Sequence, residues 1–350
     1  MNEPYNPEWN KELRLGVLGC SAIVPRAVLE PLRHVENVRV VSLANRTLIK
    51  AERMAELYGI CRTAALGELV EDASVDAVYL ALSNELHANW AIKAMEAGKH
   101  VLVEKPLCLT KDEAERLRQT ANQTGVRLQE GLMVRCHPWQ KKLKELIDSG
   151  RYGSLRRIET RITQNIQNRY SGNYRSVKAK GGGCFADLGC YWLQFLQALI
   201  GLDWNDWRGE SEYTGPGGCD WTFKARVSYP NGVEAECLTS FELPYKAYHR
   251  LVLDEAVLTI PDFFRPNLGF YKLTIQIKRR DGLAEVPTVF EPMSYYVNQL
   301  REFRDIVLDN GKSEHAAALE RFARFETIIR DAESRCAIAF RMREGEGDKS

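Results

Sequence analysis

A glycine-containing turn follows the first apolar run of the chain, and its residue types suit the binding of a nucleotide phosphate. Residues 14–18 are mostly apolar and Gly19 ends the run. Gly19 allows a tight turn, and small side chains after it let backbone N–H groups approach a pyrophosphate at a helix N-terminus. The predicted loop consists of Gly19, Cys20, Ser21, Ala22 and Ile23. Because the later glycines of the strict dinucleotide motif are absent, an ordinary strand-to-helix turn remains an alternative.

The end of the second apolar run indicates which dinucleotide would bind. Residues 38–44 form this run, and Asn45 and Arg46 follow it without a carboxylate. An NAD site usually has an acid here for the ribose 2′-hydroxyl, whereas an arginine pairs with the 2′-phosphate of NADP. We therefore expect NADP(H) in preference to NAD(H), with Asn45 and Arg46 at the cofactor. A solvated arginine at the start of a helix is the other interpretation.

The elements that must position these residues alternate between strand and helix patterns. Gly98 is placed to end one helix, and the capping box Thr110–Glu113 opens another. Continuous apolar strands in repeated βα units predict a parallel sheet covered on both faces, that is, a Rossmann dinucleotide-binding domain. The expected strands are 14–19, 38–44, 76–82, 100–104 and 126–130, and the expected helices are 23–34, 48–58, 85–97 and 110–125.

The pattern changes after about residue 151 to strands with alternating polar and apolar residues. Pro230-Asn231-Gly232 between two such strands is a strong hairpin signal. We expect an α+β domain with a large, mainly antiparallel sheet, with boundaries of 12–137 for the first domain and 138–342 for the second. The C-terminal helices could pack back on the first domain. The expected strands are 155–166, 221–229, 233–241, 250–260 and 271–278, and helical patterns cover 297–307 and 319–329.

Composition excludes several classes of protein. The chain has 350 residues, 45% hydrophobic and 27% charged, which is a globular composition with room for two domains. The net charge of +1 gives no field that attracts nucleic acid or an anionic membrane. No apolar run approaches the length of a membrane span, and the N-terminus lacks the apolar core of a signal peptide. Nine cysteines without CxxC spacing predict reduced thiols in a cytoplasmic protein, and no metal site is visible.

A set of motifs in fixed order resembles one oxidoreductase family. His100–Leu107 contains Glu104-Lys105-Pro106, which resembles the Glu-Lys-Pro motif of the Gfo/Idh/MocA family. This resemblance extends over about residues 14–335. The further matching segments are Ser83–His87, Glu96–His100, Glu130–Pro138, Asn173–Arg175 and Gly181–Tyr191. Tyr191 stands where the family often has His, as in the subgroup of dihydrodiol dehydrogenases, D-xylose dehydrogenases and deoxysugar 3-ketoreductases.

The resemblance implies that Lys105 and Tyr191 form the catalytic pair. Tyr191 is a suitable proton donor in a reduction if a nearby cation lowers the pKa of its phenol, and Lys105 can supply that cation or bind the substrate oxygen itself. The alternatives are a surface lysine before a proline turn and a helix aromatic that faces the core. Pro106 could hold a cis peptide bond that aims the lysine, which the sequence alone does not decide.

Further site residues follow from the resemblance. Beside the phosphate loop, the cofactor is expected to contact Leu82, Ser83, His87, Glu104 and Lys105. Asp187 could bind a sugar hydroxyl, orient Lys105, or serve only as a charge at a helix N-terminus. His137 has a structural alternative as well. The expected substrate-binding residues are Arg135, His137, Asn173, Tyr174, Arg175, Asp187 and Tyr191.

Together these features predict an NAD(P)(H)-dependent oxidoreductase that transfers a hydride between nicotinamide C4 and a carbonyl or hydroxyl carbon of a sugar-like substrate. NADPH-dependent keto-sugar reduction is the favoured reaction. The alternatives are an aldose or dihydrodiol dehydrogenase, an imine reductase and a non-catalytic NAD(P)-binding regulator. A homodimer or homotetramer is expected through the second domain's sheet. The sequence does not decide which sugar is bound, or whether it is free, phosphorylated or nucleotide-linked.

Overall fold

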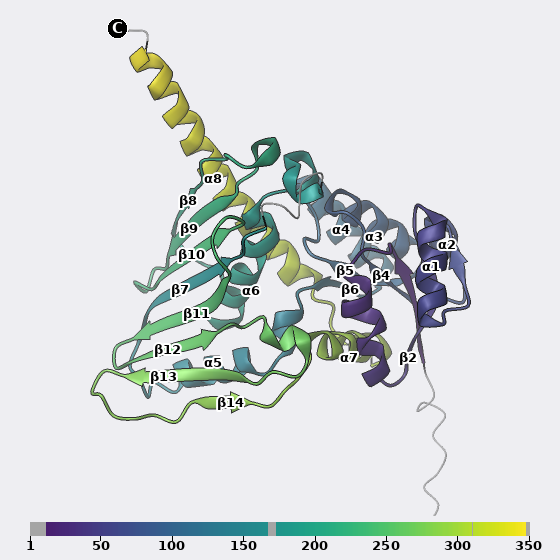
Figure 1. The fold of residues 1–350 in the computed structure, drawn as a ribbon, viewed down its shortest axis with the longest axis horizontal. Helices are drawn as coiled ribbons and strands as arrows, with labels where there is room; N and C mark the ends of the chain where they lie inside the picture. The colour runs from purple at the N-terminus through teal and green to yellow at the C-terminus, as the bar shows by residue number, and fades with distance from the viewer. Residues whose placement is uncertain (1–11, 167–172, 310, 348–350) are drawn as a thin grey trace, which may run out of the picture. The chain divides into compact units, whose positions relative to one another are not determined.

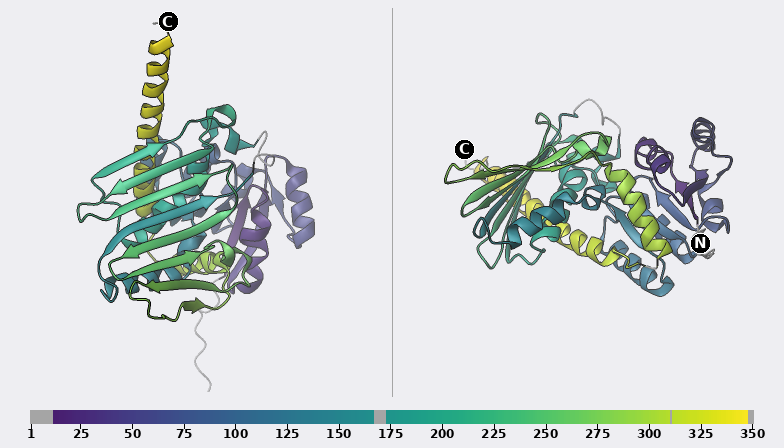
Figure 2. Two further views of the ribbon diagram at one scale, coloured as in Figure 1. Left: turned by 60° about the vertical axis from the view of Figure 1, so that its left-hand side comes forward. Right: turned by 90° about the horizontal axis from the view of Figure 1, so that it is seen from below.

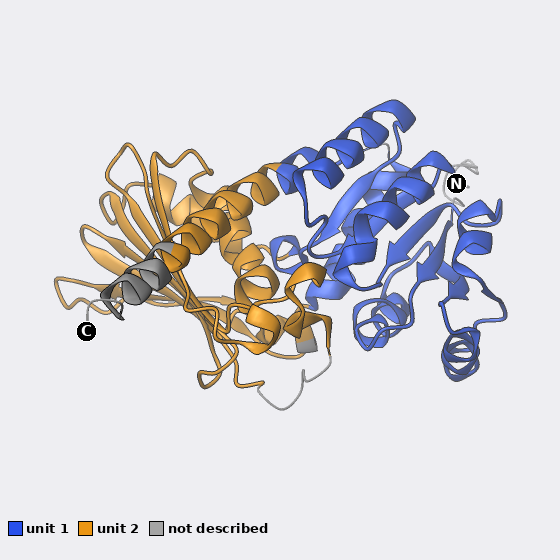
Figure 3. Cartoon of the chain, turned by 90° about the horizontal axis from the view of Figure 1, so that it is seen from above, with its two compact units in different colours: residues 1–136, 294–319 blue, residues 137–293, 320–350 orange. Residues whose placement is uncertain are grey.

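The computed structural model describes residues 12–166, 173–309 and 311–347 (Figure 1). The chain forms two compact units, which Figure 3 colours separately. Unit 1 consists of residues up to Cys136 together with Ser294–Leu319, and unit 2 consists of His137–Met293 together with the residues from Glu320 onward. Each unit therefore contains residues that are distant in the sequence.

Unit 1 is built on a parallel sheet of six strands in the order β3-β2-β1-β4-β5-β6. All five strand pairings are parallel, as the sequence predicts. β4 and β6 are buried along their whole length, which is typical of strands covered on both faces. The strands are β1 (Leu13–Leu18), β2 (Val38–Ala44), β3 (Thr63–Ala64), β4 (Ala77–Leu80), β5 (His100–Glu104) and β6 (Leu128–Gly131). The short β3 was not predicted.

The helices of unit 1 begin and end where local capping residues place them. The predicted capping box is confirmed, since Thr110 Oγ1 accepts from Glu113 N–H at 3.2 Å and the Glu113 carboxylate accepts from Thr110 N–H at 3.2 Å. Gly98 has φ +75° just beyond α3, a conformation that suits glycine. The helices are α1 (Leu48–Tyr58), α2 (Leu66–Glu71), α3 (His87–Glu96), α4 (Lys111–Thr124) and α7 (Tyr295–Leu308).

The predicted helix over 23–34 is wrong as a single regular helix. The segment forms a π-helical turn, η2 (Pro25–Leu29), followed by a 3₁₀ turn, η3 (Pro31–His34). Pro31 has no N–H to donate and interrupts a regular helix. The phosphate loop is therefore followed by two short turns, so that the backbone amides of the loop itself, and not a long helix dipole, are the groups available to an anion.

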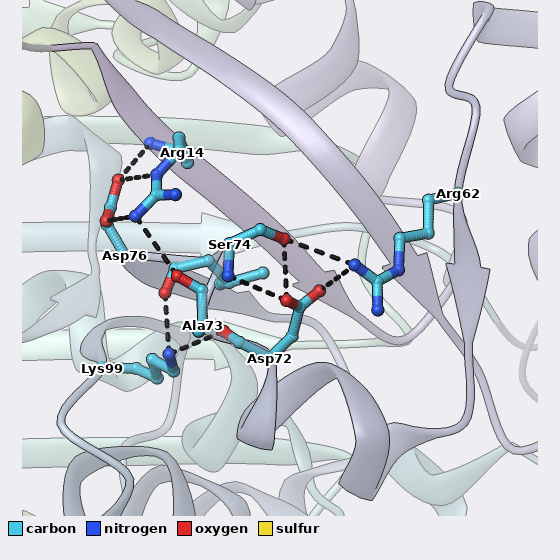
Figure 4. Close-up of polar contacts among 8 residues, drawn as sticks. Arg14, Arg62, Asp72, Ala73, Ser74, Asp76 and Lys99 are labelled. Atoms are coloured by element: carbon cyan, nitrogen blue, oxygen red, sulfur yellow. Dashed lines mark hydrogen bonds and ion pairs between the residues drawn. The ribbon is translucent and has the colours of Figure 1, made fainter.

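A polar network joins the amino ends of three parallel strands (Figure 4). Arg14, near the start of β1, donates from Nε and from its backbone N–H to Asp76 just before β4, both at 2.9 Å. Lys99, which precedes β5, is 8% exposed and donates from Nζ to the carbonyl oxygens of Asp72 at 2.7 Å and Val75 at 2.8 Å. These contacts lie at the opposite edge of the sheet from the phosphate loop and stabilise the fold.

Unit 2 contains an eight-stranded sheet in the order β14-β13-β12-β11-β7-β10-β9-β8. β7 and β10 are parallel and every other pair is antiparallel, which confirms the predicted mainly antiparallel sheet. The predicted hairpin is present, with Gly232 at φ +82° between β9 and β10. The strands are β7 (Leu155–Thr163), β8 (Asp206–Glu210), β9 (Thr222–Ser228), β10 (Glu234–Ser240), β11 (Lys246–Leu253), β12 (Ala256–Pro261), β13 (Leu273–Arg279) and β14 (Thr288–Phe290).

The predicted strand 250–260 is two strands. β11 and β12 form an antiparallel hairpin that turns at Asp254 and Glu255. Asp254 is tied to β7, because its carboxylate accepts from Ser154 N–H at 2.8 Å and pairs with Arg156 at 2.7 Å. Two charged residues inside an otherwise apolar run were the signal for this turn. β8 and β14, at the two ends of the sheet, were not predicted either.

The two faces of the large sheet differ in character. Along β9, Phe223, Ala225 and Val227 are buried, whereas Lys224 and Arg226 are exposed. Within unit 2, α5 (Trp139–Asp148), α6 (Cys190–Leu199) and the first turns of unit 2 in α8 (His315–Gly347), from residue 320, lie along one face, as the views in Figure 2 show. The opposite face carries cross-strand ion pairs, including Arg157 with Glu236 at 2.7 Å.

All nine cysteines fall within the described residues, and none of them forms a disulfide. Among the helices that the structure describes, none is both long and apolar enough to cross a membrane.

Replacement of Lys99 by methionine tests the network at the amino ends of the strands. The variant keeps the length of the side chain but leaves the carbonyl groups of Asp72 and Val75 without their charged donor. We expect the free energy of unfolding to fall by about 1–3 kcal/mol, measured by urea unfolding followed by circular dichroism. The matched control is Lys50→Met on the exposed side of α1, which should leave the transition in place; equal transitions for both variants would refute a stabilising role of Lys99.

Candidate active site

The phosphate loop is held between the ends of β1, β2 and β4. Gly19 has φ +98°, and a Cβ atom built on it would lie 2.5 Å from the carbonyl oxygen of Ala81, so glycine is required for this approach. Gly19 N–H donates to the carbonyl of Ala44 at 2.7 Å. Cys20 N–H donates to Asn45 Oδ1 at 3.2 Å, so the predicted cofactor residue Asn45 holds the loop from the end of β2.

The loop presents backbone groups that fit a pyrophosphate. Ser21 and Ala22 are exposed, and their N–H groups donate to no acceptor in the described part of the chain. Ile23 is half-buried, and its carbonyl accepts from Ala27 N–H at 2.8 Å in the turn that follows. A loop of small residues with uncommitted amides at the carboxyl end of the first parallel strand is the arrangement of a dinucleotide site.

Arg46 directly follows Asn45 at the carboxyl end of β2 and is exposed. Its guanidinium forms no ion pair with any carboxylate of the residues described. Asn45 is hydrogen-bonded to the phosphate loop, and Arg46 is the next residue in the chain. The side chain of Arg46 can therefore reach a phosphate on the adenosine ribose. The residues present therefore fit a nucleotide with a 2′-phosphate.

Lys105 directly follows the carboxyl end of β5, at the same edge of the sheet as the phosphate loop. The Lys105–Pro106 peptide bond is cis. The preceding Glu104 is half-buried and accepts a hydrogen bond from the hydroxyl of Tyr79 on β4. Burial raises the pKa of Glu104, while Tyr79 and the adjacent Lys105 oppose that shift. Glu104 and Lys105, both predicted, thus follow each other in the chain at the end of a buried strand.

His87 lies beneath this turn rather than facing solvent. It is 1% exposed, with Nδ1 2.7 Å from the carbonyl oxygen of Pro106 and Nε2 3.1 Å from the carbonyl oxygen of Leu82. Burial lowers the pKa of His87, and the neutral ring has one N–H for two acceptors. The shorter contact favours the tautomer in which Nδ1–H donates to Pro106. In the structure His87 contacts the turn that carries Lys105, and its predicted contact with the cofactor stays a prediction.

Two further contacts fix the same edge. Leu107 N–H donates to the carboxylate of Glu130 on β6 at 3.1 Å, which holds the chain just beyond Pro106. Ser83 follows β4 after Leu82, and its carbonyl accepts from Leu86 N–H at 2.9 Å in a 3₁₀ turn. Leu82 and Ser83 are half-buried at the carboxyl end of β4, beside the glycine of the phosphate loop.

In unit 2, the predicted catalytic Tyr191 lies in the first turn of α6, directly after a π-helical turn, η8 (Phe185–Gly189). Asp187 and Tyr191 are four residues apart, a spacing that places two side chains on one helical face. Tyr191 is 7% exposed and packs edge-on against Phe264, with ring centroids 4.8 Å apart. A Cβ on Gly189 would lie 2.4 Å from the ring of Phe185, which explains the glycine two residues after Asp187.

A buried carboxylate holds the segment that leads into this helix. Asp220, 3% exposed, accepts from Phe185 N–H at 2.7 Å and from the Cys184 thiol at 3.2 Å. A Cβ on Gly183 would lie 1.9 Å from Asp220 Oδ1, so glycine is required at the end of the Gly181–Gly183 run, where the backbone passes this carboxylate. Phe185 in turn stacks on Phe223 of β9 at 4.3 Å. Asp220 was not predicted; its signal was a carboxylate beside the apolar run of β9.

Arg175 and Asp187 bind each other within unit 2. Arg175 Nε donates to Asp187 Oδ2 at 3.0 Å, and both side chains are largely buried. Asn173 Oδ1 accepts from Arg175 N–H at 3.1 Å, and the guanidinium lies over the ring of Tyr174 at 4.6 Å. Arg175 and Asp187, both expected to bind substrate, thus pair with each other, and their contacts with a substrate stay predictions.

Arg135 and His137 also have partners other than those expected. Arg135 pairs with Glu302 at 2.8 Å and Glu314 at 2.6 Å, both within unit 1, so its charge is compensated by two carboxylates. His137 is 3% exposed, and burial lowers its pKa to about 4, so it is neutral at pH 7. Its Nδ1 accepts from Trp139 N–H at 3.2 Å and its ring meets Phe290 edge-on. Both residues therefore have partners within their own units, and their predicted substrate roles stay predictions.

Sequence reasoning missed Tyr79, Glu130 and Asp220 as positioning residues. Tyr79 is the one residue of the buried strand β4 whose side chain has a polar group. Glu130 carries a carboxylate although it is only 7% exposed. A polar atom in a strand that must be buried needs a partner, and this was the available signal. No group of three metal-ligating side chains occurs among the described residues.

Comparison with known proteins agrees with this arrangement. Residues 13–132 match the oxidoreductase family GFO_IDH_MocA with an NAD-binding Rossmann fold, and residues 140–255 match the GFO/IDH/MocA C-terminal domain. A dTDP-3,4-didehydro-2,6-dideoxy-α-D-glucose 3-reductase of Streptomyces violaceoruber is 31% identical over 276 residues, which is 79% of this chain and 80% of that protein. A D-xylose 1-dehydrogenase (NADP⁺) of Haloferax volcanii is 28% identical over 83% of this chain and 88% of its own length.

Among solved structures, the 3-ketoreductase KijD10 of Actinomadura kijaniata in complex with NADP and TDP-benzene has a TM-score of 0.80 and 27% sequence identity. The match covers 89% of this chain and 94% of that one.

Replacement of Asp220 by asparagine tests how the helix of Tyr191 is held. Burial raises the pKa of Asp220 from its ordinary 3.8 to about 6, so the folded state favours the neutral acid. Its contribution to stability is present below about pH 4 and is lost as the pH rises through 6. Asparagine does not ionise, so the unfolding free energy of the variant minus that of the wild type should rise by up to about 3 kcal/mol from pH 4 to pH 7.

Urea unfolding at a series of pH values measures this difference. Asp203→Asn is the matched control, because the Asp203 side chain is 94% exposed, and its difference from the wild type should not change with pH. A pH-independent difference for the Asp220 variant would show that the buried carboxyl does not titrate in this range.

Proposed function

The chain belongs to the GFO/IDH/MocA family of oxidoreductases, and we propose that it uses NADPH to reduce a keto group of a sugar-like substrate. The observation that carries this proposal is that Gly19 and Lys105 lie at the same edge of the parallel sheet. Gly19 packs against the end of β4, and Lys105 emerges from the end of the neighbouring β5. A lysine fixed beside a nucleotide loop is placed to act where the nicotinamide would lie.

The residues of the chain have separate tasks in this reaction. When bound, NADPH supplies the hydride to the carbonyl carbon of the substrate. Tyr191 donates the proton that the substrate oxygen then needs, and Lys105 stabilises the negative charge that forms at that oxygen and on the phenol. Lys105 belongs to unit 1 and Tyr191 to unit 2. Asp187 and Arg175 shape the substrate side of the site as a neutral pair.

The arginine charges of the proposed site are compensated within the chain, which supports a substrate that binds through its hydroxyl groups. Arg175 is balanced by Asp187, and Arg135 is balanced by Glu302 and Glu314. Neither arginine then supplies an uncompensated cation for a phosphate on the reacting sugar. The relatives from Streptomyces violaceoruber and Haloferax volcanii act, by their names, on a nucleotide-linked deoxysugar and on D-xylose, so reduction of a keto-sugar is proposed with the oxidative direction as its reverse.

We also propose self-association through the open face of the eight-stranded sheet. This face carries charges of both signs on neighbouring strands, such as Arg250 with Glu159 at 2.7 Å and Arg157 with Glu236 at 2.7 Å. Alternating charges of this kind are complementary to a second copy of the same surface.

The preference for NADPH is tested by Arg46→Ala. Loss of a charge-assisted contact to the 2′-phosphate costs about 1.5–3 kcal/mol, so we expect the Kd for NADPH to rise at least tenfold and that for NADH to stay the same. Fluorescence titration of the purified chain with each nucleotide measures both constants. Arg53→Ala, an exposed arginine on α1, is the control. Tighter binding of NADH by the wild type, or equal weakening for both nucleotides, would exclude Arg46 as the phosphate ligand.

The catalytic pair is tested by Lys105→Met and Tyr191→Phe. We expect each change to lower kcat by 10²-fold or more, because a positioned proton donor and its charge partner contribute about 10²–10⁴-fold. The Kd for NADPH should change less than threefold. Turnover is followed by the absorbance of the reduced nicotinamide with a panel of free and nucleotide-linked keto-sugars. Tyr58→Phe removes a hydroxyl at the end of α1 and serves as the control; near-normal turnover of either site variant contradicts the mechanism.

A further inference from the structure

The turn after β12 presents two consecutive phenylalanine rings. It begins at Asp262, which has φ +45°, a left-handed conformation that aspartate adopts more readily than most side chains. The Asp262 carbonyl accepts from Arg265 N–H at 3.0 Å, and its carboxylate pairs with the Arg265 guanidinium at 3.0 Å. Phe264 has φ −84° and ψ −12°, values typical of the third residue of a type I turn. Two contacts therefore close the turn and fix the backbone that carries Phe263 and Phe264.

Phe263, the first of these rings, belongs to an aromatic stack in the core of unit 2. It is 1% exposed and stacks on His249 of β11, with ring centroids 4.2 Å apart and an angle of 23° between the planes. His249 also stacks on Phe195 of α6, at 3.7 Å and 18°. Two rings this close to one imidazole would collide on the same face of it. His249 therefore lies between Phe195 and Phe263.

The sheet anchors the imidazole of His249. Its Nδ1 lies 2.9 Å from Oγ1 of Thr160, which stands directly opposite on the neighbouring β7. His249 is 1% exposed and Thr160 is 3% exposed. Burial lowers the pKa of His249 well below its ordinary value, so the ring is neutral at pH 7. A neutral ring with a hydrogen-bonded nitrogen is a stable centre for the stack.

Phe264, the second ring of the turn, meets the proposed proton donor. Its ring lies edge-on to that of Tyr191, with centroids 4.8 Å apart and planes at 81°. Tyr191 and Phe195 are four residues apart on α6, a spacing that places both side chains on one face of the helix. Consecutive rings of one turn thus contact this face at two levels, Phe264 directly and Phe263 through His249. The proposed mechanism assigns no task to Phe264 or His249.

We propose that Phe264 is a positioning residue, which holds the phenol ring of Tyr191 in the direction that proton donation needs. The proposal rests on the proposed function of Tyr191. An edge-to-face partner restricts the rotation of a phenol ring, and phenylalanine has no polar atom that could compete for the proton. The stack centred on His249 keeps the turn, and with it Phe264, in place against α6. A displacement of a reacting group by about 1 Å can cost up to about 10²-fold in rate, so this support affects turnover.

The kinetic test compares Phe264→Leu, which removes the ring but keeps an apolar side chain, with Phe264→Tyr, which keeps the ring. For Phe264→Leu we expect kcat to fall about tenfold, while KM and the Kd for NADPH change less than threefold. Phe264→Tyr should retain at least about half of the wild-type kcat. The matched control is Phe270→Leu, because Phe270 is 65% exposed and stacks on its neighbour Tyr271 at 4.5 Å; it should behave as the wild type.

His249→Leu tests the support of Phe264. It removes the centre of the stack and leaves Phe264 itself unchanged, so kcat should fall in the same way, again with KM and the Kd for NADPH little changed. Circular dichroism shows whether each variant is folded. Phe264 is half-buried, whereas His249 lies in the core. The comparison of Phe264→Leu with Phe264→Tyr therefore decides the proposal even where His249→Leu does not fold.

A second measurement does not require turnover. The full chain is labelled with 3-fluorotyrosine, and the ¹⁹F resonance of Tyr191 is assigned by its absence in Tyr191→Phe. The shift of this resonance between H₂O and D₂O reports how far solvent reaches the ring, which is 7% exposed in the structure. We expect this solvent shift to rise at least about twofold in Phe264→Leu and to keep its wild-type value in Phe264→Tyr and Phe270→Leu.

The outcomes separate this proposal from the proposed function. If no keto-sugar is reduced but the solvent shift of Tyr191 rises in Phe264→Leu alone, the positioning holds and only the reaction assignment fails. An unchanged solvent shift together with wild-type kcat in Phe264→Leu would overturn the positioning. A rise in KM with unchanged kcat would also overturn it, because Phe264 would then be a substrate contact. Equal loss of kcat in Phe264→Leu and Phe264→Tyr would show that the ring is not what the site needs.

Discussion

The site depends on how the chain leaves β5. The turn at Lys105 and Pro106 is held at three points: the Glu104 carboxylate by the hydroxyl of Tyr79, the Pro106 carbonyl by His87, and the Leu107 amide by Glu130. These holding groups come from β4, α3 and β6, so the neighbours of β5 on both sides in the sheet fix its end. A flexible lysine side chain gains its direction from a main chain that cannot move, and such support by surrounding hydrogen bonds is what makes a site precise.

Local features of the fold could be predicted because their physics is local. Gly19 at φ +98°, the reciprocal bonds of Thr110 and Glu113, and the hairpin at Gly232 each depend on a few consecutive residues. The π-helical turn after the phosphate loop and the break of 250–260 at Asp254 were missed. The first depends on how two prolines are accommodated, and the second depends on the bond of Asp254 to Ser154, a hundred residues earlier.

The partners of buried charges could not be predicted because they lie far away in the sequence. Arg135 meets Glu302 and Glu314, which lie 167 and 179 residues away in the sequence. A lone arginine in a motif has the same appearance whether it binds a substrate or two carboxylates of its own unit. Burial of a cation requires compensation, so a guanidinium that the fold encloses must find acids nearby. Arg46 differs because the fold leaves it exposed.

The two units hold their chemical groups in different ways, and this difference suits the task that we propose for each group. In unit 1, the turn that carries Lys105 is held by polar contacts with Tyr79, His87 and Glu130. In unit 2, Tyr191 is placed by packing: its helix is anchored through Phe185, which stacks on Phe223 at 4.3 Å, and its own ring meets Phe264. A proton donor needs a fixed direction, and an aromatic core supplies that direction without adding charge. A cation that must stabilise a transient anion needs a controlled electrostatic environment, which neighbouring charges and oriented hydrogen bonds provide.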